Sequence, residues 1–358
     1  MEINIQGKRY RHADILHIDI VESDDSLFGK TMRFCQEWLR GKERFSITTS
    51  GTTGKPKPIT LHRRQMVASA RMTVQALGLK AGDRALVCLN TGFIGGMMML
   101  VRGMEAELIM TIVSPSSDPF ETLLQPDFDF TAVVPLQLQT IFDVKKHEAL
   151  QPMKALLVGG APVSAALQQQ IQTIKAPVYH TYGMTETVSH IALRQLNGAK
   201  ATEEFHALEG ITLGLNERNC LTIRGEVTGN QTITTNDRVQ LLTAHSFTWL
   251  GRIDLVINSG GIKIQVDQLE EAVSAVFARH LINNRFFIAG LPDPLLGEKV
   301  VCVIEGQPFG PFKEKLIKGD LYQALGKYEQ VKTFKYVAAF EFSETGKLLR
   351  KQTMTKKL

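Results

Sequence analysis

The stretch "ALLVGGAPVSAALQQQIQTIKAPVYHTYGMTET" (residues 155–187) contains one strand–helix–strand unit. Its apolar runs "ALLVGG" and "APVYHTYG" predict buried strands, and "SAALQQQIQTI" between them predicts a helix. Both strand runs end in glycine. In a doubly wound sheet, ligands bind at the carboxyl ends of the strands, where a residue without a side chain leaves room for them. The stretch therefore indicates an α/β fold with a ligand site at this edge of the sheet.

The same alternation of strands and helices extends toward the N-terminus. Further strands are expected at 84–90, 106–113 and 130–135, and further helices at 92–106, 118–125 and 135–143. Alternation of this kind is typical of a doubly wound, mostly parallel sheet with helices on both faces.

The pattern changes after about residue 205. Short strands separated by turns predict an antiparallel β subdomain. A boundary near Gly251–Leu255 is followed by a helix over 265–280 and by further strands, which is typical of a small α+β domain. We therefore expect two domains, a large N-terminal one over residues 1–251 and a small C-terminal one over residues 252–358.

The composition limits the kind of protein. A chain of 358 residues with 44% hydrophobic and 22% charged residues is typical of a soluble globular protein. Its net charge of +5 favours small anionic ligands over nucleic acid. The most apolar stretch (93–113) contains Arg102, Glu105 and Glu107, which argues against a membrane span. Without an apolar signal core, and with four cysteines that lack metal or redox spacing, a cytoplasmic protein with reduced thiols is expected.

A second signal is the stretch "TSGTTGKPK" (residues 49–57). It combines small hydroxyl side chains, two glycines and two lysines, which is the chemistry of a phosphate cradle. It differs from the common P-loop, whose glycines are farther apart and whose lysine is followed by Ser or Thr. A flexible polar linker is the alternative that this stretch alone leaves open.

Five further stretches follow this phosphate loop in order. They are "GGAP" (159–162), "YGMTET" (182–187), "TND" (235–237), "GRIDLVINSGGIKI" (251–264) and "ETGKLLRK" (344–351). Together with the loop, they resemble the motif series of the adenylate-forming superfamily of acyl-CoA synthetases, nonribosomal peptide adenylation domains and luciferases. The resemblance implies an enzyme that uses ATP and Mg²⁺ to convert a carboxylic acid into an acyl-adenylate, and that commonly passes the acyl group to a thiol.

The resemblance assigns most of the matching residues to ATP binding. Gly159, Gly160 and Ala161 match the adenine pocket, and Tyr182, which precedes Gly183, matches the residue that stacks on adenine. Which of the two loop lysines makes the main phosphate contact stays open. The ATP-binding residues of the phosphate loop are Thr49, Ser50, Gly51, Thr52, Thr53, Gly54, Lys55 and Lys57.

Asp237 and Arg252 resemble the residues that bind the ribose hydroxyls. Asn236 stands where the family usually has glycine, and asparagine tolerates the left-handed geometry that such a position can require. Asp254 resembles the hinge residue between the domains, with a solvated turn aspartate as the alternative. Lys347 resembles the catalytic lysine that bridges the acid and the α-phosphate, although the proline usual upstream of it is absent.

Thr185 and Glu186 complete the adenylating site that the resemblance implies. Thr185 matches a phosphate contact and Glu186 the magnesium ligand, and one carboxylate suffices because Mg²⁺ also takes phosphate oxygens. Gly260 and Gly261 match the glycine-bearing loop that faces the thiol tunnel and leaves room for pantetheine. No carrier-protein signature follows Lys347, so free coenzyme A is the expected acceptor.

The acid is inferred from "YGMTETVSHIALRQL" (182–196), which looks like the version of the motif found in o-succinylbenzoate–CoA ligases of menaquinone biosynthesis. Such an acid is aromatic and carries a second carboxylate, and His190 and Arg194 are the candidate basic residues beside it. Surface or packing roles are the alternative for both. Phe93 lies where relatives often have an aromatic–histidine pair that lines the acyl pocket.

The leading hypothesis is therefore an AMP-forming ligase that joins o-succinylbenzoate to CoA and releases AMP and pyrophosphate. The alternatives are another aryl- or acyl-CoA ligase of the same fold, or a nucleotide-binding relative without catalysis. Neither nucleic acid nor a membrane is an expected partner, and the sequence leaves a homodimer open.

Overall fold

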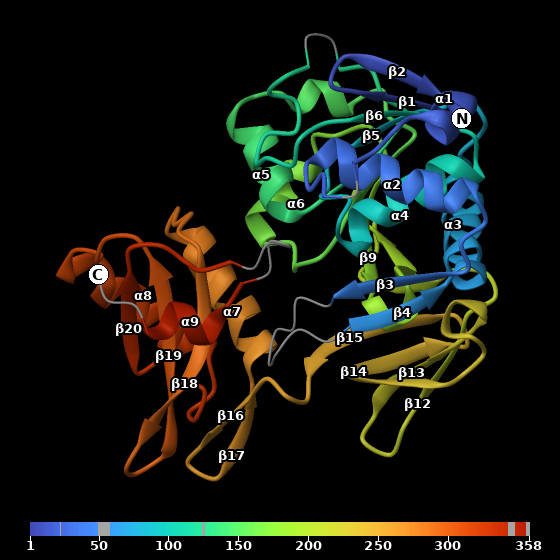
Figure 1. Cartoon of the computed structure of the whole chain (residues 1–358). Coiled ribbons are helices and arrows are strands. Elements are labelled where there is room, and N and C mark those ends of the chain that lie inside the picture. The colour runs from blue at the N-terminus through green and yellow to red at the C-terminus, as the bar shows by residue number, and fades with distance from the viewer. Residues whose placement is uncertain (22, 49–57, 124–125, 343–347, 356–358) are drawn as a thin grey trace.

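The computed structural model describes residues 1–21, 23–48, 58–123, 126–342 and 348–355. The phosphate loop (49–57) and Lys347 therefore lie outside the described residues. Within the described ranges the chain forms one large sheet, a smaller sheet near the C-terminus and a two-stranded hairpin. Figure 1 shows the large sheet and its helices on the right and the smaller sheet on the left.

The centre of the large sheet is parallel. Six strands lie in the order β9-β8-β7-β5-β6-β1, and each neighbouring pair among them is parallel. Their bounds are β1 Glu2–Ile5, β5 Arg84–Val87, β6 Ile109–Ile112, β7 Phe130–Val133, β8 Ala155–Val158 and β9 Val178–Gly183. All four residues of β8 are buried, as expected of a strand covered on both faces. The predicted mostly parallel α/β sheet is confirmed.

Helices cover both faces of these strands. They are α1 His12–His17, α2 Leu27–Leu39, α3 Arg63–Leu77, α4 Ile94–Glu105, α5 Pro135–Asp143, the short helix η1 His147–Leu150, and α6 Ala165–Ile171. In β5, Ala85 and Val87 pack into a core with α2, α3 and α4, whereas Leu86 packs into another core with α5 and α6. Successive side chains of a strand point to opposite faces, so the two cores lie on the two sides of the sheet.

Antiparallel strands extend the same sheet at both edges. The strand β10 (His190–Gln195) pairs with β9, and the order continues through β11, β15, β14, β13 and β12. Their bounds are β11 Phe205–Ala207, β12 Thr212–Leu215, β13 Cys220–Arg224, β14 Ile233–Thr243 and β15 Ser246–Arg252, with short helices η2 Thr185–Thr187 and η3 Glu226–Thr228. At the other edge, β2 (Lys8–Arg11) pairs with β1. The antiparallel region is thus continuous with the parallel one through β10, a strand that sequence analysis did not predict.

The smaller sheet begins after β15. Its strands are β16 Val256–Ser259, β17 Ile262–Gln265, β18 Phe286–Asp293, β19 Gly297–Glu305 and β20 Thr333–Val337, and its helices are α7 Val266–Arg279, α8 Pro311–Ala324 and α9 Arg350–Thr355. The buried face of α7 contains the apolar residues expected from their spacing, Leu269, Val273, Val276 and Phe277. The sheets change between Arg252 and Val256, close to the predicted boundary. A division into two separate domains at residue 251 stays a prediction.

The hairpin formed by β3 (Arg44–Thr48) and β4 (Pro58–His62) flanks the phosphate loop in sequence. Phe45 and Ile47 on β3 and Leu61 on β4 are buried in the core that contains α2 and α3. The chain on either side of residues 49–57 is therefore anchored in the core that contains α2 and α3.

One predicted element is wrong. The helix expected over 118–125 is absent from its described part, where residues 119–122 form turns. The Oδ1 atom of Asp118 accepts a hydrogen bond from the backbone amide of Phe120 at 2.9 Å, and its Oδ2 atom binds Lys146 Nζ at 2.7 Å. An aspartate that bonds to nearby backbone groups offers the chain an alternative to a helix.

Two further observations concern the chain as a whole. None of the helices in the described part of the chain has the length and apolar character needed to cross a membrane. The four cysteines are buried and free, and burial raises the pKa of the Cys35 and Cys88 thiols to about 12.

Candidate active site

Two glycines at the carboxyl ends of β8 and β9 shape the edge of the sheet. A methyl group in place of a Gly159 hydrogen would lie 2.1 Å from Thr181 Oγ1, and one on Gly183 would lie 2.3 Å from the Ser189 carbonyl oxygen. At Gly159 a larger residue would displace the Thr181 side chain, and at Gly183 it would displace the backbone of Ser189 and His190. The strand ends therefore approach each other closely, as expected where a ligand lies against the backbone.

Asp237 on β14 is the centre of a polar network beside this edge. The Tyr182 hydroxyl on β9 donates to its Oδ2 atom at 2.7 Å, and the indole nitrogen of Trp249 on β15 donates to its Oδ1 atom at 3.2 Å. Arg252 Nη1 lies 3.6 Å from the same Oδ1 atom. Burial, and secondarily the Asp237 charge, raise the pKa of Tyr182, so its hydroxyl stays a donor. The network presents a fixed carboxylate that can accept hydrogen bonds from sugar hydroxyls.

The structure thus brings Tyr182, Asp237 and Arg252 together, as predicted, and adds Trp249, which sequence analysis missed. The Tyr182 ring contacts Phe247 edge-on, with ring centroids 5.1 Å apart. Trp249 follows Asp237 by twelve residues across the β14–β15 hairpin. Side chains alternate between the two faces of this hairpin, and that alternation could have predicted that the indole lies near the carboxylate.

Arg252 also contacts Asp254, the predicted hinge residue. Its Nε and Nη2 atoms donate to the two Asp254 carboxylate oxygens, both at 2.8 Å, and Asn236 Nδ2 donates to Asp254 Oδ2 at 3.3 Å. The hydrogen bonds from Arg252 lower the pKa of Asp254. Asp254 is therefore paired rather than simply solvated, and the Asn236 position couples the ribose-side network to it.

Helix α7 of the smaller sheet meets this network. The Oδ2 atom of Asp267 accepts a hydrogen bond from the Arg252 backbone amide at 3.0 Å, and burial raises the pKa of Asp267. The first turn of α7 is thereby joined to the end of β15.

The loop after β9 carries Thr185 and Glu186 in η2. The Glu186 side chain is exposed, and its carboxylate has no hydrogen-bond or ion-pair partner among the described residues. The loop is held by Thr187, whose backbone and hydroxyl bond to Met184, and it continues into Val188. Val188 is fully buried with φ +67°, a conformation that strains a β-branched residue. The strained, closely bonded turn fixes the backbone position from which the Glu186 side chain extends.

Glu186 fits a magnesium ligand. A free, exposed carboxylate can bind a hydrated cation without first breaking an ion pair, and Mg²⁺ commonly takes one or two carboxylates together with phosphate and water oxygens. Within the described ranges, no cluster of three or more His, Cys, Asp or Glu side chains could hold a metal ion by itself.

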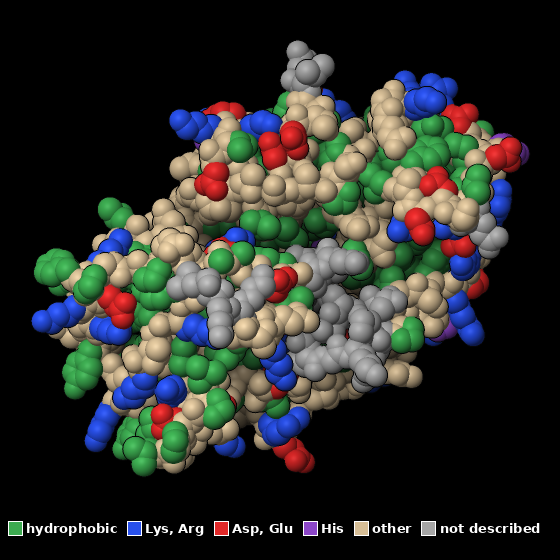
Figure 2. Space-filling view, turned by 60° about the vertical axis from the view of Figure 1, so that its left-hand side comes forward, with side chains coloured by type: hydrophobic (Ala, Val, Ile, Leu, Met, Phe, Trp, Pro, Cys, Tyr) green, Lys and Arg blue, Asp and Glu red, His purple; other side chains and the backbone are tan. Residues whose placement is uncertain are grey.

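A cavity of about 430 Å³ opens beside this loop. It is lined mainly by glycines and by apolar side chains from β3, α4, α5 and the loops after β5 and β9, and Figure 2 shows the molecule hollowed between its upper and lower-left parts. Predicted site residues in the lining are Phe93, Gly159, Gly160, Gly183, Thr185 and His190. The cavity therefore joins the predicted acyl pocket to the predicted adenylating loop.

Arg102 on α4 lines the same cavity and was missed as a site residue. Its side chain is 2% exposed, and no carboxylate lies within ion-pair distance of it among the described residues. Its Nη2 atom donates to Ser189 Oγ at 2.8 Å, whereas its buried Nε has no partner. Burial lowers the pKa of Arg102 to about 10, so the guanidinium remains charged at neutral pH. A charged residue inside an apolar helix was the available signal, since such a residue is rarely buried without a partner.

Arg194 takes a different position from the one expected. It forms an ion pair with Glu203 and lies over the Phe205 ring at 5.6 Å, and it is not among the residues that line the cavity. The structure brings His190, but not Arg194, to the predicted acyl pocket.

Gly260 and Gly261 form the turn between β16 and β17. The Gly260 amide donates to the Leu296 carbonyl oxygen at 2.8 Å, which joins this turn to the β18–β19 hairpin. The turn belongs to the smaller sheet, as the predicted role in thiol binding requires.

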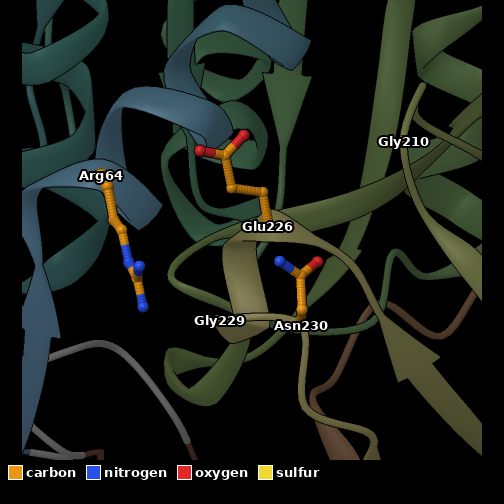
Figure 3. Close-up of a pocket in the computed structure, with 5 residues that line it drawn as sticks. All are labelled: Arg64, Gly210, Glu226, Gly229 and Asn230. Carbon is orange, nitrogen blue, oxygen red and sulfur yellow. The ribbon is translucent and has the colours of Figure 1, made fainter.

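A second hollow, of about 340 Å³, lies between α3 and η3. Figure 3 shows Arg64 extending from α3, with Glu226 and Asn230 across from it. The neighbouring Gln65 donates to the Val227 carbonyl oxygen at 2.9 Å and fixes α3 to η3. Because its charges are mixed and none of the predicted site residues lines it, we regard this hollow as a packing junction.

The fold and the site define an α/β protein with a ligand cavity at the carboxyl ends of parallel strands and a carboxylate network beside it. The chain belongs to the family of AMP-binding enzymes, whose model matches residues 40–209. A solved structure of an acyl-CoA synthetase (AMP-forming)/AMP-acid ligase II-like protein from Dyadobacter fermentans is 42% identical, with a TM-score of 0.64. The match covers 96% of this chain and 97% of that one. The resemblance to the adenylate-forming superfamily is thereby confirmed.

More distant relatives include 2-succinylbenzoate–CoA ligase from Bacillus cereus. It is 27% identical over 348 residues, which cover 88% of this chain and 71% of that protein. The solved structure of o-succinylbenzoate CoA synthetase from Bacillus subtilis, in complex with its acyl-adenylate intermediate, is 20% identical and has a TM-score of 0.72. It covers 87% of this chain and 69% of that one, and at this identity the likeness supports the fold alone.

Proposed function

We propose that the protein is an AMP-forming acid–CoA ligase whose acid is o-succinylbenzoate. In the first step the acid carboxylate attacks the α-phosphorus of ATP, forming an acyl-adenylate and releasing pyrophosphate. In the second step the thiol of coenzyme A displaces AMP and forms the thioester. A cytoplasmic location in menaquinone biosynthesis accords with this activity and stays a prediction.

The observation that carries the choice of acid is the buried Arg102. Its unpartnered Nε and its charge sit at a cavity otherwise lined mainly by apolar groups. Burying a cation without a counter-ion costs several kcal/mol, so such a residue is expected where a ligand supplies the negative charge. In an aromatic acid with a second carboxylate, the ring would pack against the apolar lining and the second carboxylate would pair with the Arg102 guanidinium. A simple benzoate or a fatty acid would leave the cation unpaired.

The nucleotide would be bound by the groups at the strand ends. Asp237 and Arg252 are suited to the ribose hydroxyls, and the Gly159–Ala161 backbone with Tyr182 to the adenine. Magnesium, when bound at Glu186, would neutralise phosphate charge during the first step. The phosphate loop and Lys347 carry the remaining proposed roles.

The second step requires a thiol site beside the adenylate. The turn at Gly260 and Gly261 is proposed to admit the pantetheine arm, because neither residue has a side chain to fill the passage. The turn lies on the smaller sheet, and the link between Asp254 and Arg252 at the end of β15 is the proposed pivot.

The test is acid-dependent exchange of pyrophosphate into ATP across a panel of acids. We expect exchange with o-succinylbenzoate to exceed exchange with benzoate and with fatty acids, and added coenzyme A to yield the thioester. Exchange with benzoates or fatty acids, but none with o-succinylbenzoate, would reject this acid while keeping the reaction class. Binding of ATP without AMP production for any acid would indicate a nucleotide-binding protein without catalysis.

A further inference from the structure

A chain of four polar side chains connects α4 to α3 along one wall of the cavity. Arg102 Nη2 lies 2.8 Å from Ser189 Oγ, Ser189 Oγ lies 3.4 Å from His190 Nδ1, and His190 Nε2 lies 3.0 Å from Thr73 Oγ1. The side chains of Arg102, His190 and Thr73 are at most 6% exposed. Because water has little access to these groups, the hydrogens between neighbouring members are donated within the chain.

The far end of the chain fixes the position of the histidine proton. Thr73 Oγ1 lies 3.0 Å from the Ser69 carbonyl oxygen, which can only accept, so the threonine hydroxyl donates to it. The Thr73 oxygen must then accept from His190, and the hydrogen sits on Nε2. Burial, and secondarily the Arg102 charge, hold the pKa of His190 well below its ordinary value, so the ring is neutral and Nδ1 is bare.

The direction of the remaining bonds follows. A bare Nδ1 accepts the Ser189 hydroxyl hydrogen, and the Ser189 oxygen in turn accepts from Arg102 Nη2. The serine hydrogen is thus committed to the histidine and does not face the cavity. Arg102 is the last donor of the chain, and its other N–H groups are left for a ligand with negative charge.

We propose that His190, as the neutral Nε2–H tautomer, is a positioning residue that sets the preference for acids with a second anionic group. It orients the Ser189 hydroxyl, and the oriented Ser189 oxygen holds the Arg102 guanidinium at the cavity. The inference rests on the proposed function, because it concerns the selectivity of the same acyl pocket. Protonated His190 would donate from Nδ1 and would deprive Ser189 of its acceptor. Among the elements packed against the ring, α4 contributes the charged Arg102 and α3 contributes the uncharged Thr73.

Two substitutions at one position separate the two ends of the ring. In His190→Asn, the amide oxygen takes the place of Nδ1 and can still accept from Ser189. In His190→Gln, the amide nitrogen takes the place of Nε2 and can still donate to Thr73, but the acceptor for Ser189 is lost. A third variant, Ser189→Ala, removes the link between the histidine and the arginine while changing volume little.

The measured quantity is the ratio of kcat/KM for o-succinylbenzoate to kcat/KM for its analogue with the aromatic carboxylate esterified, which keeps the aliphatic carboxylate that is adenylated. We expect His190→Gln and Ser189→Ala to lower this ratio about 10-fold or more, through a higher KM for the charged acid, and His190→Asn to keep it within about 3-fold. Thermal unfolding of each variant reports any loss of packing separately. The wild-type KM for the charged acid should stay flat between pH 6 and 8, since His190 is neutral throughout.

The other possible outcomes distinguish a failure of the proposed acid from a failure of this inference. If the wild-type protein does not prefer the charged acid, both the proposed acid and this inference fall. If it does prefer the charged acid but His190→Gln and Ser189→Ala keep the preference, only this inference falls. Equal losses in the Asn and Gln variants would reduce His190 to a packing role and overturn the proposed direction of the bonds. A KM that rises below pH 7 in the wild type, but not in His190→Gln, would overturn the neutral tautomer.

Discussion

At the scale of single residues, burying Arg102 and His190, and partly burying His180, carries an electrostatic cost that packing alone does not explain. His180 on β9 and His190 on β10 are both held neutral, His180 with a pKa of about 4, chiefly because burial penalises the charged ring. Burial also lowers the pKa of Arg102, but the guanidinium stays charged at neutral pH and has no counter-ion among the described residues. Groups with such perturbed pKa values are concentrated at functional sites.

Arg102→Met should weaken acid binding without unfolding the protein. Methionine has similar length and no charge, so replacing an unpaired buried cation should change the free energy of unfolding by less than about 1 kcal/mol, or raise it. Losing a charge-assisted contact worth about 1.5–3 kcal/mol should raise the KM for o-succinylbenzoate about 10- to 150-fold. Exchange kinetics with o-succinylbenzoate and with benzoate check this, benzoate serving as the control acid. An unchanged KM for o-succinylbenzoate in the folded variant would contradict the role of Arg102.

The partly buried His180 should make the protein less stable in acid. Its folded pKa of about 4 lies below the unfolded value near 6.5, so below that pH the unfolded chain binds a proton that the native protein does not. The free energy of unfolding therefore falls as pH drops from about 6.5 toward 4, by up to about 1.4 kcal/mol per pH unit. The free energy of unfolding can be measured with urea at pH 7.0 and at pH 5.5. Its decrease between these two pH values should be smaller by about 1 kcal/mol in His180→Gln than in the wild type. Equal drops would mean that the His180 pKa is not depressed.

At the scale of elements, the sequence predicted the helices and strands that are specified by their own residues. The helix expected over 135–143 is found as α5 with the same bounds, because proline suits the first turn and Leu138 and Ile141 supply the buried face. The strand β10 was missed, since it exists through pairing with β9 rather than through a strong pattern of its own.

The same distinction holds for the site. Tyr182 and Asp237 could be predicted because each lies in a short motif, and the fold brings them together across 55 residues. The role of Arg102 was harder to predict, because a charged residue in an apolar helix indicates a buried charge but not its partner, and Ser189 lies 87 residues away. Contacts between distant segments depend on the topology, which no short motif specifies.

The η2 element leads to a prediction about magnesium. Glu186→Gln should strongly impair adenylate formation, because it removes the one negative charge that this turn offers to a cation beside the phosphates. The amide keeps the size of the side chain, and the Glu186 carboxylate has no described partner to lose, so the fold should survive. Pyrophosphate exchange measured against magnesium concentration checks this, with circular dichroism as the control for folding. An unchanged magnesium dependence and turnover would refute the role.

At the scale of the whole molecule, the smaller sheet meets the larger one through few but specific polar contacts. Asp254 binds Arg252 at the end of β15, and Asp267 on α7 binds the Arg252 backbone amide. At its other side, Arg350 on α9 donates to both carboxylate oxygens of Glu270 on α7, at 2.7 and 2.9 Å. The chain that follows Lys347 is therefore fixed to α7, the helix that contacts the large domain. Any rotation about Asp254 would move Arg350 and α9 together with the smaller sheet.

This arrangement predicts that Lys347 serves only one of the two steps. If the smaller domain rotates between the steps, the lysine is present for adenylate formation and withdrawn for thioester formation. Lys347→Ala should then lower adenylate formation by about two to three orders of magnitude, the scale expected when a preorganised charge is removed from a transition state. The same variant, supplied with preformed acyl-adenylate and coenzyme A, should form the thioester at nearly the wild-type rate.

Lys351→Ala is the matched control, because Lys351 is an exposed lysine on α9 only four residues away in sequence. It should be close to wild type in both assays, so that a loss in Lys347→Ala reflects position rather than a change in surface charge. Equal losses of both steps in Lys347→Ala would argue for a lysine held at the phosphates throughout and against the rotation, while leaving the adenylation chemistry intact. Full activity of Lys347→Ala in both assays would instead reduce "ETGKLLRK" to a solvated segment, because a side chain that neutralises charge in the transition state cannot be removed without slowing the step it serves.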